Sequence, residues 1–135
     1  QELARKTRGL PTSIDKRLDL FCEKLGTLLD LKDEKPALLH GDLWSGNYFA
    51  SHDQIPYIFD PAVYFGLRET DLAMTEMFGR LPQEFYSTYQ EVFPIQSGYS
   101  ERKDIYNLYH LLNHYNLFGG SYLEQADQTV RSFLD

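Results

Sequence analysis

The chain has 135 residues, of which 42% are hydrophobic and 24% are charged, as in an ordinary globular protein. The 13 basic residues against 20 acidic ones give a net charge of −7, which excludes a broad surface for nucleic acid or anionic membrane. Any phosphate group that the protein handles should therefore be held locally, through a metal ion.

The first part of the chain predicts one amphipathic helix. Apolar residues recur at spacings of four and three after Thr12, a potential N-cap, which predicts a helix over residues 13–31. The charged stretch at residues 32–36 ends in a proline and predicts a break. The apolar positions of the expected helix are Ile14, Leu18, Phe21, Leu25 and Leu28.

Short apolar runs then predict strands. Residues 37–39 and 57–59 are too short for helices, and a third short strand is expected at residues 48–50. Polar turn-forming residues at 51–54 separate the last two runs. We expect a small hairpin that carries the intervening loop.

Beyond Pro61 the sequence predicts helices. The expected starts are marked by Glu69, Pro82, Ser100 and Ser121. The expected ends are marked by Gly79, Pro94 and Gly119. The predicted fold is mainly α, a helical bundle with a small β element, and residues 1–135 are expected to form a single domain.

Cysteine usage and the chain start bear on location. Cys22 is the only cysteine, so an internal disulfide is excluded. No apolar run approaches the roughly 20 residues of a membrane span, and residues 1–10 lack the apolar centre of a signal peptide. We expect a cytoplasmic protein.

The loop HGDLWSGN, residues 40–47, carries the chemistry that the sequence predicts. Asp42 and Asn47 lie within it, and Asp60 follows the strand expected at 57–59. Phosphoryl transfer from ATP needs a carboxylate that orients the attacking hydroxyl, together with oxygen ligands for Mg²⁺. Asp42 is the candidate base, and Asn47 and Asp60 are the candidate metal ligands.

The neighbouring side chains have more than one interpretation. His40 is placed to hold the backbone around Asp60 by hydrogen bonds rather than to exchange protons with a substrate. Trp44 is either a core residue or a ring face for a sugar or a base. Asp and Asn are also common turn residues, and Arg68, Glu69 and Asp71 can be a solvated helix start.

Three longer runs add a resemblance to a known family. LLHGDLWSGN, FDPAVYFG and RETDLAMTEMFG occur in that order within residues 36–120. Together they resemble the fructosamine kinase (ketosamine kinase) family, relatives of aminoglycoside and choline phosphotransferases within the protein-kinase-like fold. The resemblance implies the carboxy-terminal lobe of that fold.

The resemblance also implies roles for individual residues. Asp42 resembles the catalytic base, Asn47 and Asp60 resemble the magnesium ligands, and Trp44 resembles a wall of the ketosamine site. Asp71 resembles a structural carboxylate that braces the catalytic loop. ATP is the implied co-substrate, and the implied acceptor is a small or protein-linked ketosamine.

The chain departs from the family pattern in two respects. Leu67 stands where the family usually has His, which removes a polar side chain near the active face. Residues 1–36 contain neither a glycine-rich loop nor a strand lysine, which the amino-terminal, ATP-gripping lobe of such kinases supplies. We expect the chain alone to bind ATP weakly, to phosphorylate little, and to self-associate through the surface that the missing lobe leaves exposed.

Other functions remain open from the sequence. The chain is alternatively a non-catalytic truncated remnant or binding module of the same fold, or part of a choline- or aminoglycoside-type kinase. A metal-dependent hydrolase that uses the same carboxylates is a third option. His110 and His114 have the spacing of a metal pair, but the glutamate of an H-E-x-x-H motif is missing, so we expect a packing or surface role for them.

Overall fold

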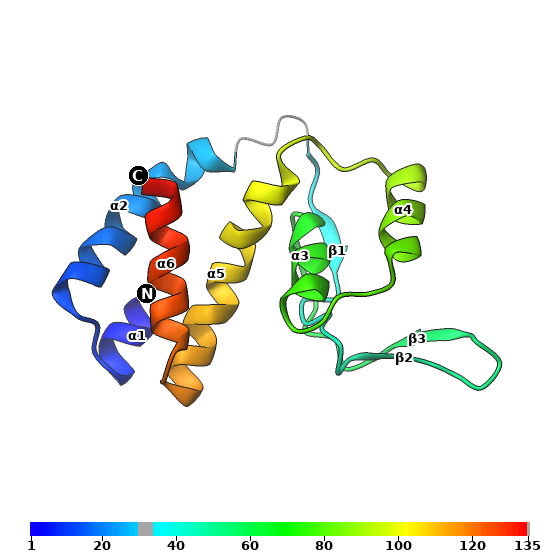
Figure 1. Cartoon of the computed structure of the whole chain (residues 1–135), viewed down its shortest axis with the longest axis horizontal. Helices are drawn as coiled ribbons and strands as arrows, with labels where there is room; N and C mark the ends of the chain where they lie inside the picture. Colours follow the sequence, from blue (N-terminus) through cyan, green and yellow to red (C-terminus); the bar gives the residue numbers. More distant parts are fainter. Residues whose placement is uncertain (30–33, 135) are drawn as a thin grey trace. The chain divides into compact units, whose positions relative to one another are not determined.

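A computed structural model describes residues 1–29 and 34–134, which form two compact units (Figure 1). One unit contains residues 1–29 and 107–134, and the other contains residues 34–106. The end of the predicted first helix and the first two residues of the predicted break after it, 32 and 33, lie outside the described residues. The single domain stays a prediction.

Helices dominate the described residues. The helices are α1 (Glu2–Thr7), α2 (Thr12–Leu28), α3 (Glu69–Met77), α4 (Gln83–Val92), α5 (Tyr99–Phe118) and α6 (Tyr122–Leu134). The strands are β1 (Ala37–Leu39), β2 (Tyr48–Ala50), β3 (Pro56–Ile58) and β4 (Tyr64–Gly66). In the part of the chain that the structure covers, none of these helices is both long and apolar enough to cross a membrane.

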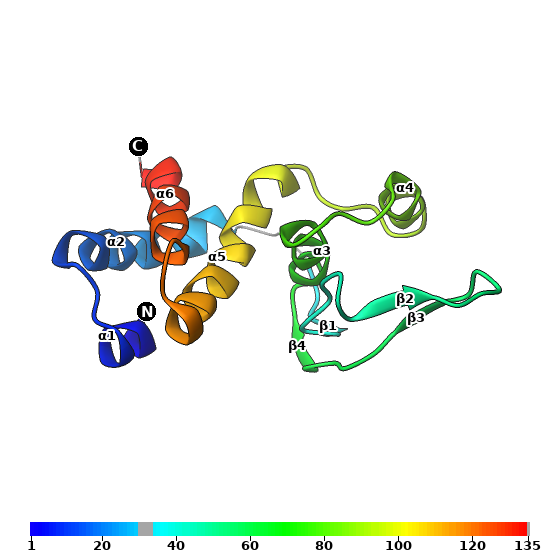
Figure 2. The same cartoon turned by 60° about the horizontal axis from the view of Figure 1, so that its bottom comes forward.

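The first unit is built around α2 and α6, which lie side by side (Figures 1 and 2). Phe21 of α2 is only 2% exposed, and its ring lies 5.9 Å from that of Phe133. Arg17 pairs with Asp127 across the same interface at 2.5 Å. The amphipathic helix is confirmed, but it begins at Thr12, so the predicted N-cap is wrong by one residue.

Two features of this unit bear on the sequence predictions. The short helix α1 was not predicted, because its six residues are too few for a periodic pattern. His114 Nδ1 lies 2.8 Å from the carbonyl oxygen of His110, and its ring contacts those of Phe118 and Tyr122. His110 is also buried, so of the packing or surface role predicted for the two histidines, packing is confirmed.

The second unit contains two small antiparallel sheets. β1 pairs with β4, and β2 pairs with β3. The strands expected at 37–39 and 48–50 are confirmed. The strand expected at 57–59 is shifted by one residue to Pro56–Ile58. The prediction that a hairpin carries the loop is wrong. The loop joins β1 of one sheet to β2 of the other, because the partner of β1 is β4, a strand that the sequence pattern did not predict.

The helix α3 is the buried centre of the second unit and lies beside β1 (Figures 1 and 2). Leu72, Ala73 and Met74 are buried on it. The predicted helix start at Glu69 is confirmed, whereas Ser100 is the second residue of α5 and not its cap. This arrangement puts the first turn of α3 against the loop that follows β1.

Candidate active site

The loop after β1 has a backbone conformation that only glycine accepts easily at position 41. Gly41 has φ +81°, and a Cβ added there would collide with the carbonyl oxygen of Ala62. The Ala62 N–H donates to the His40 carbonyl oxygen at 2.8 Å. The loop is therefore held against the segment that leads into β4.

Asp42 and Asn47 are in direct contact. The Asn47 Nδ2 donates to the backbone oxygen of Asp42 at 2.8 Å and to its Oδ2 at 3.0 Å, and Asn47 is only 5% exposed. Because both partners are acceptors, the amide nitrogen must face them. The Oδ1 of Asn47 then faces away from Asp42, where it can serve as a ligand for a cation.

The backbone before Asp60 is held from both sides. The Phe59 N–H donates to the Asn47 carbonyl oxygen at 3.1 Å, and the Phe59 carbonyl oxygen lies 3.0 Å from His40 Nε2. Since a carbonyl only accepts, His40 Nε2 carries the proton. Asp60 itself is exposed and has φ +54°, a conformation that is strained for a non-glycine residue and is enriched at functional sites.

Asp71 holds the start of the loop from the first turn of α3. Its Oδ2 accepts the His40 N–H at 2.7 Å, and its Oδ1 accepts the Gly41 N–H at 2.9 Å. A carboxylate that accepts two backbone N–H groups forms strong, directional bonds. Asp71 therefore fixes the backbone next to Asp42.

Trp44 lies over the loop rather than in the core. It is 38% exposed, its ring meets that of Phe78 edge-on at 6.3 Å, and a Cβ at Gly46 would collide with it. The interpretation of Trp44 as a core residue is therefore wrong. Part of its ring remains available to a ligand.

A divalent cation would need more than acidic side chains here. Within residues 1–29 and 34–134, no three His, Cys, Asp or Glu side chains come together as a metal site. Magnesium commonly binds to one or two protein carboxylates and completes its shell with water and substrate phosphates. By their chemistry, the Asn47 amide oxygen and the Asp60 carboxylate are donors of the kind that such a sparse set uses.

The sequence interpretation of Arg68 and Glu69 as a solvated helix start is wrong. Glu69 is fully buried, with its carboxylate bonded to Arg102 at 2.7 and 2.9 Å and to the Tyr106 hydroxyl at 3.0 Å. The hydrogen bonds that Arg102 donates to Glu69 raise the pKa of Arg102 above its ordinary value. Arg68 is also buried and pairs with Glu34 at 2.7 Å.

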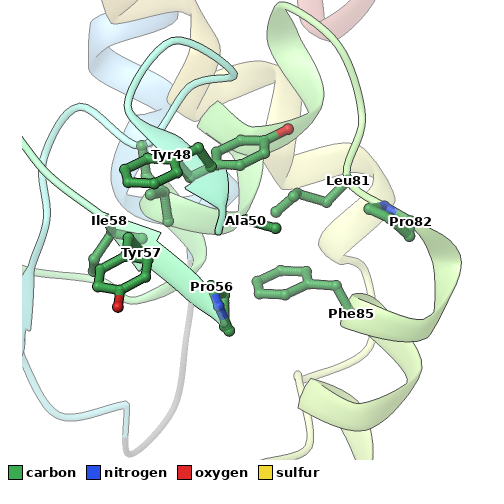
Figure 3. Close-up of a pocket in the computed structure, with 10 residues that line it drawn as sticks. Tyr48, Ala50, Pro56, Tyr57, Ile58, Leu81, Pro82 and Phe85 are labelled. Atoms are coloured by element: carbon green, nitrogen blue, oxygen red, sulfur yellow. The ribbon is translucent and has the colours of Figure 1, made fainter. Parts of the chain in front are cut away.

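An apolar cavity of about 360 Å³ lies next to the loop, between the hairpin of β2 and β3 and the start of α4 (Figure 3). Figure 3 shows Pro56 and Ala50 on the hairpin side and Leu81, Pro82 and Phe85 on the other. Leu43 connects the cavity to the loop. With so few polar groups in its wall, the cavity is not a phosphate site.

The chain is similar to known proteins over nearly all of its residues. Residues 2–135 match the family model described as fructosamine kinase. A Vibrio parahaemolyticus protein named a probable ketoamine kinase is 51% identical over 129 residues, which are 96% of this chain and 43% of that protein. The Arabidopsis thaliana protein-ribulosamine 3-kinase is 47% identical over 133 residues, which are 98% of this chain and 40% of that protein.

A solved structure agrees. The crystal structure of a candidate fructosamine-3-kinase from Thermobifida fusca superposes with a TM-score of 0.88 at 33% identity, covering 98% of this chain and 46% of that one. The chain thus spans less than half the length of each of these relatives. The match over nearly all of its residues shows that this chain belongs to the fructosamine kinase family.

Proposed function

We propose that the chain carries the catalytic loop and the magnesium ligands of an ATP-dependent kinase that phosphorylates a sugar hydroxyl of a ketosamine. The observation that carries the proposal is the direct bond between Asn47 and the Asp42 carboxylate. It joins the candidate base to a candidate metal ligand, so that the two move as one unit. The family membership of the chain supports the same reaction.

Each side chain then has a defined task. Asp42 orients the acceptor hydroxyl and takes its proton as the hydroxyl oxygen bonds to the γ-phosphorus and ADP leaves. Asn47 Oδ1 and the Asp60 carboxylate would hold Mg²⁺, which neutralises charge on the phosphates when bound. The exposed face of Trp44 stacks against the sugar.

The names of the relatives favour a ketosamine acceptor. Ketoamine and protein-ribulosamine kinases are named for an amine-linked sugar, small or protein-bound. Choline and aminoglycosides are the alternative acceptors, and a panel of acceptors assayed with ATP distinguishes them. A cytoplasmic location remains part of the proposal.

The chain alone is expected to be a weak catalyst. It spans 43% of the Vibrio relative, and phosphate contacts in kinase-like folds come from two lobes. Titration calorimetry with Mg²⁺ and ATP tests this expectation. Micromolar binding by these 135 residues would contradict both the weak binding expected here and the alternative of a non-catalytic remnant.

Asp42→Asn tests the base in the complete gene product. We expect kcat to fall by about 10²- to 10⁴-fold, because the amide cannot accept the proton, while the affinity for ATP stays the same. Asp53→Asn, which changes an exposed carboxylate in the loop between β2 and β3, is the matched control and should keep full activity. Full activity in Asp42→Asn would refute the proposed role.

The metal ligands can be tested without turnover. Paramagnetic Mn²⁺ added with ATP should broaden the NMR signals of residues 41–47 and 59–61 in the labelled chain, because manganese occupies the same oxygen sites as magnesium. Asp60→Asn should remove the broadening, and Asp53→Asn should not. Broadening that survives Asp60→Asn would place the cation elsewhere.

A further inference from the structure

The first turn of α3 has no side-chain cap, although the Thr70 N–H donates to the Leu67 carbonyl oxygen at 3.0 Å. The residue at its N-cap position is Arg68, which has helical backbone angles and provides no side-chain capping bond. Helix starts without such a cap leave backbone N–H groups unpaired and fray readily. Yet Asp71, in this same turn, makes two short bonds to the loop after β1. Side chains at the start of the helix hold the turn instead, and Arg68 is one of them, with bonds to Glu34, to the Tyr89 hydroxyl and to the carbonyl oxygens of Phe93 and Pro94.

Glu69 provides a second, fully buried contact from the first position of the helix. Both of its carboxylate oxygens bond to the Arg102 guanidinium, at 2.9 Å from Nε and 2.7 Å from Nη2, and the Tyr106 hydroxyl adds a third bond. Paired bonds between a guanidinium and a carboxylate fix orientation as well as distance. Because Glu69 is fully buried, water cannot substitute for its partners.

Arg102 is also held by bonds other than those to Glu69. Its Nη1 donates to the carbonyl oxygen of Ser97 at 2.7 Å, and its Nη2 donates to that of Gln96 at 3.1 Å. The guanidinium is therefore held by the backbone that leads into α5 as well as by its own helix. Glu69 is attached to a rigid base, and its position in turn sets that of the helix start.

We propose that Glu69 is a positioning residue, which fixes the first turn of α3 so that Asp71 can hold the His40 and Gly41 amides and thereby orient Asp42. The Asp71 side chain is short and cannot follow the loop if the turn shifts by about 1 Å, since hydrogen bonds weaken steeply beyond their normal length. The role of Glu69 in catalysis rests on the proposed function, but its effect on the loop backbone does not.

A purely stabilising role makes a different prediction. If the Glu69–Arg102 pair only stabilised the second unit, its loss would raise the amide hydrogen exchange of every protected group there by a similar factor. If it positions Asp71, the His40 and Gly41 amides should lose protection selectively. The Phe59 amide, bonded to Asn47, is the internal reference.

Hydrogen exchange by NMR on Glu69→Gln in the chain itself tests this. We expect exchange at His40 and Gly41 to accelerate by about tenfold more than at Phe59, because the loss of a charged, buried partner is large and local. Thr75→Val is the matched control. Thr75 is also fully buried on α3, and its Oγ1 lies 2.8 Å from the Tyr86 hydroxyl.

Thr75→Val should accelerate hydrogen exchange at the Phe59 amide and at the His40 and Gly41 amides by equal factors. Equal factors in Glu69→Gln as well would overturn the proposal. Asp71→Asn sets the upper limit of this selective acceleration, because it directly removes one of the two acceptors that the His40 and Gly41 amides share.

Tyr106→Phe keeps the test informative if Glu69→Gln does not fold. This change removes one of the bonds to Glu69, and we expect a selective acceleration of about threefold at the His40 and Gly41 amides. No selectivity in this variant would overturn the proposal. In the complete gene product, Tyr106→Phe should lower kcat with KM for ATP unchanged. A failure of Asp42→Asn to lose activity would refute the proposed function and leave the exchange result intact.

Discussion

Two residues of the loop region adopt positive φ angles, at +81° for Gly41 and +54° for Asp60. Glycine adopts such an angle without steric strain, whereas aspartate adopts it with a cost in conformational free energy. The two positions flank the Asp42–Asn47 contact in the sequence. Local backbone geometry is therefore part of how the candidate site is built.

Gly41→Ala should destabilise the second unit. An added Cβ meets both an unfavourable φ and the Ala62 carbonyl oxygen, and we expect a loss of about 2 kcal/mol or more in the free energy of unfolding. Urea unfolding measures it. Gly26→Ala in α2, where a Cβ meets no atom within 4 Å, should instead stabilise by about 0.5–1 kcal/mol. A neutral Gly41→Ala would contradict the role of this turn in the fold.

At the scale of elements, α3 and α5 are connected by acidic residues of α3 that accept bonds from α5. The Tyr99 hydroxyl donates to Glu76 at 2.9 Å, and the Tyr106 hydroxyl donates to Glu69 at 3.0 Å. Burial, followed by the nearby carboxylates, raises the pKa of both phenols well above the ordinary value. The folded protein therefore retains these protons in alkali.

This difference predicts alkaline instability. Above about pH 10 the unfolded chain releases both phenolic protons while the folded chain keeps them, so the free energy of unfolding falls as pH rises. The expected slope is about 1.4 kcal/mol per pH unit for each tyrosine, and it is absent below about pH 10. Urea titrations at a series of alkaline pH values measure it.

The double variant Tyr99→Phe, Tyr106→Phe should flatten this dependence, since neither side chain then has a proton to lose. Tyr109→Phe, at an exposed position of the same helix, controls for the loss of a phenol. An equally steep fall in the double variant would show that other groups cause it.

At the scale of the whole molecule, the strands of the second unit leave large apolar side chains exposed. Leu38 of β1 and Phe65 of β4 lie opposite each other in register and are 65% and 74% exposed. Opposed side chains in an antiparallel pair lie on the same face and form one patch. Exposed apolar patches of this kind favour association.

We predict that the chain self-associates through this patch. Leu38→Ser with Phe65→Ser should weaken self-association by at least about tenfold, because each buried side chain contributes on the order of 1.5–3 kcal/mol. Sedimentation velocity over a range of concentrations measures the effect. Val92→Ser, at an exposed position on α4, is the control. A chain that stays monomeric throughout would contradict the prediction.

Local sequence determined much of this protein. Asp42 and Asn47 meet because one short loop carries both, and the segment after β3 bonds to that loop through the Phe59 N–H and the Asn47 carbonyl oxygen. Helix periodicity located α2, the acidic residue Glu69 located the start of α3, and Pro82 located the start of α4 to within one residue. These features depend on neighbours within a few residues, which a sequence pattern contains. The role of Asp71 came from the family resemblance and not from spacing.

Tertiary structure alone decided the remaining features. The partner of β1 lies beyond Pro61, so no local pattern revealed the sheet that β1 and β4 form. In the sequence, Glu69 looks like any charged residue at a helix start. Only the fold brings Arg102, 33 residues further along, into contact with its carboxylate. The physical reason is that the burial and ion pairing of a residue depend on which distant residue packs against it. Periodicity indicates only which side of a segment is apolar.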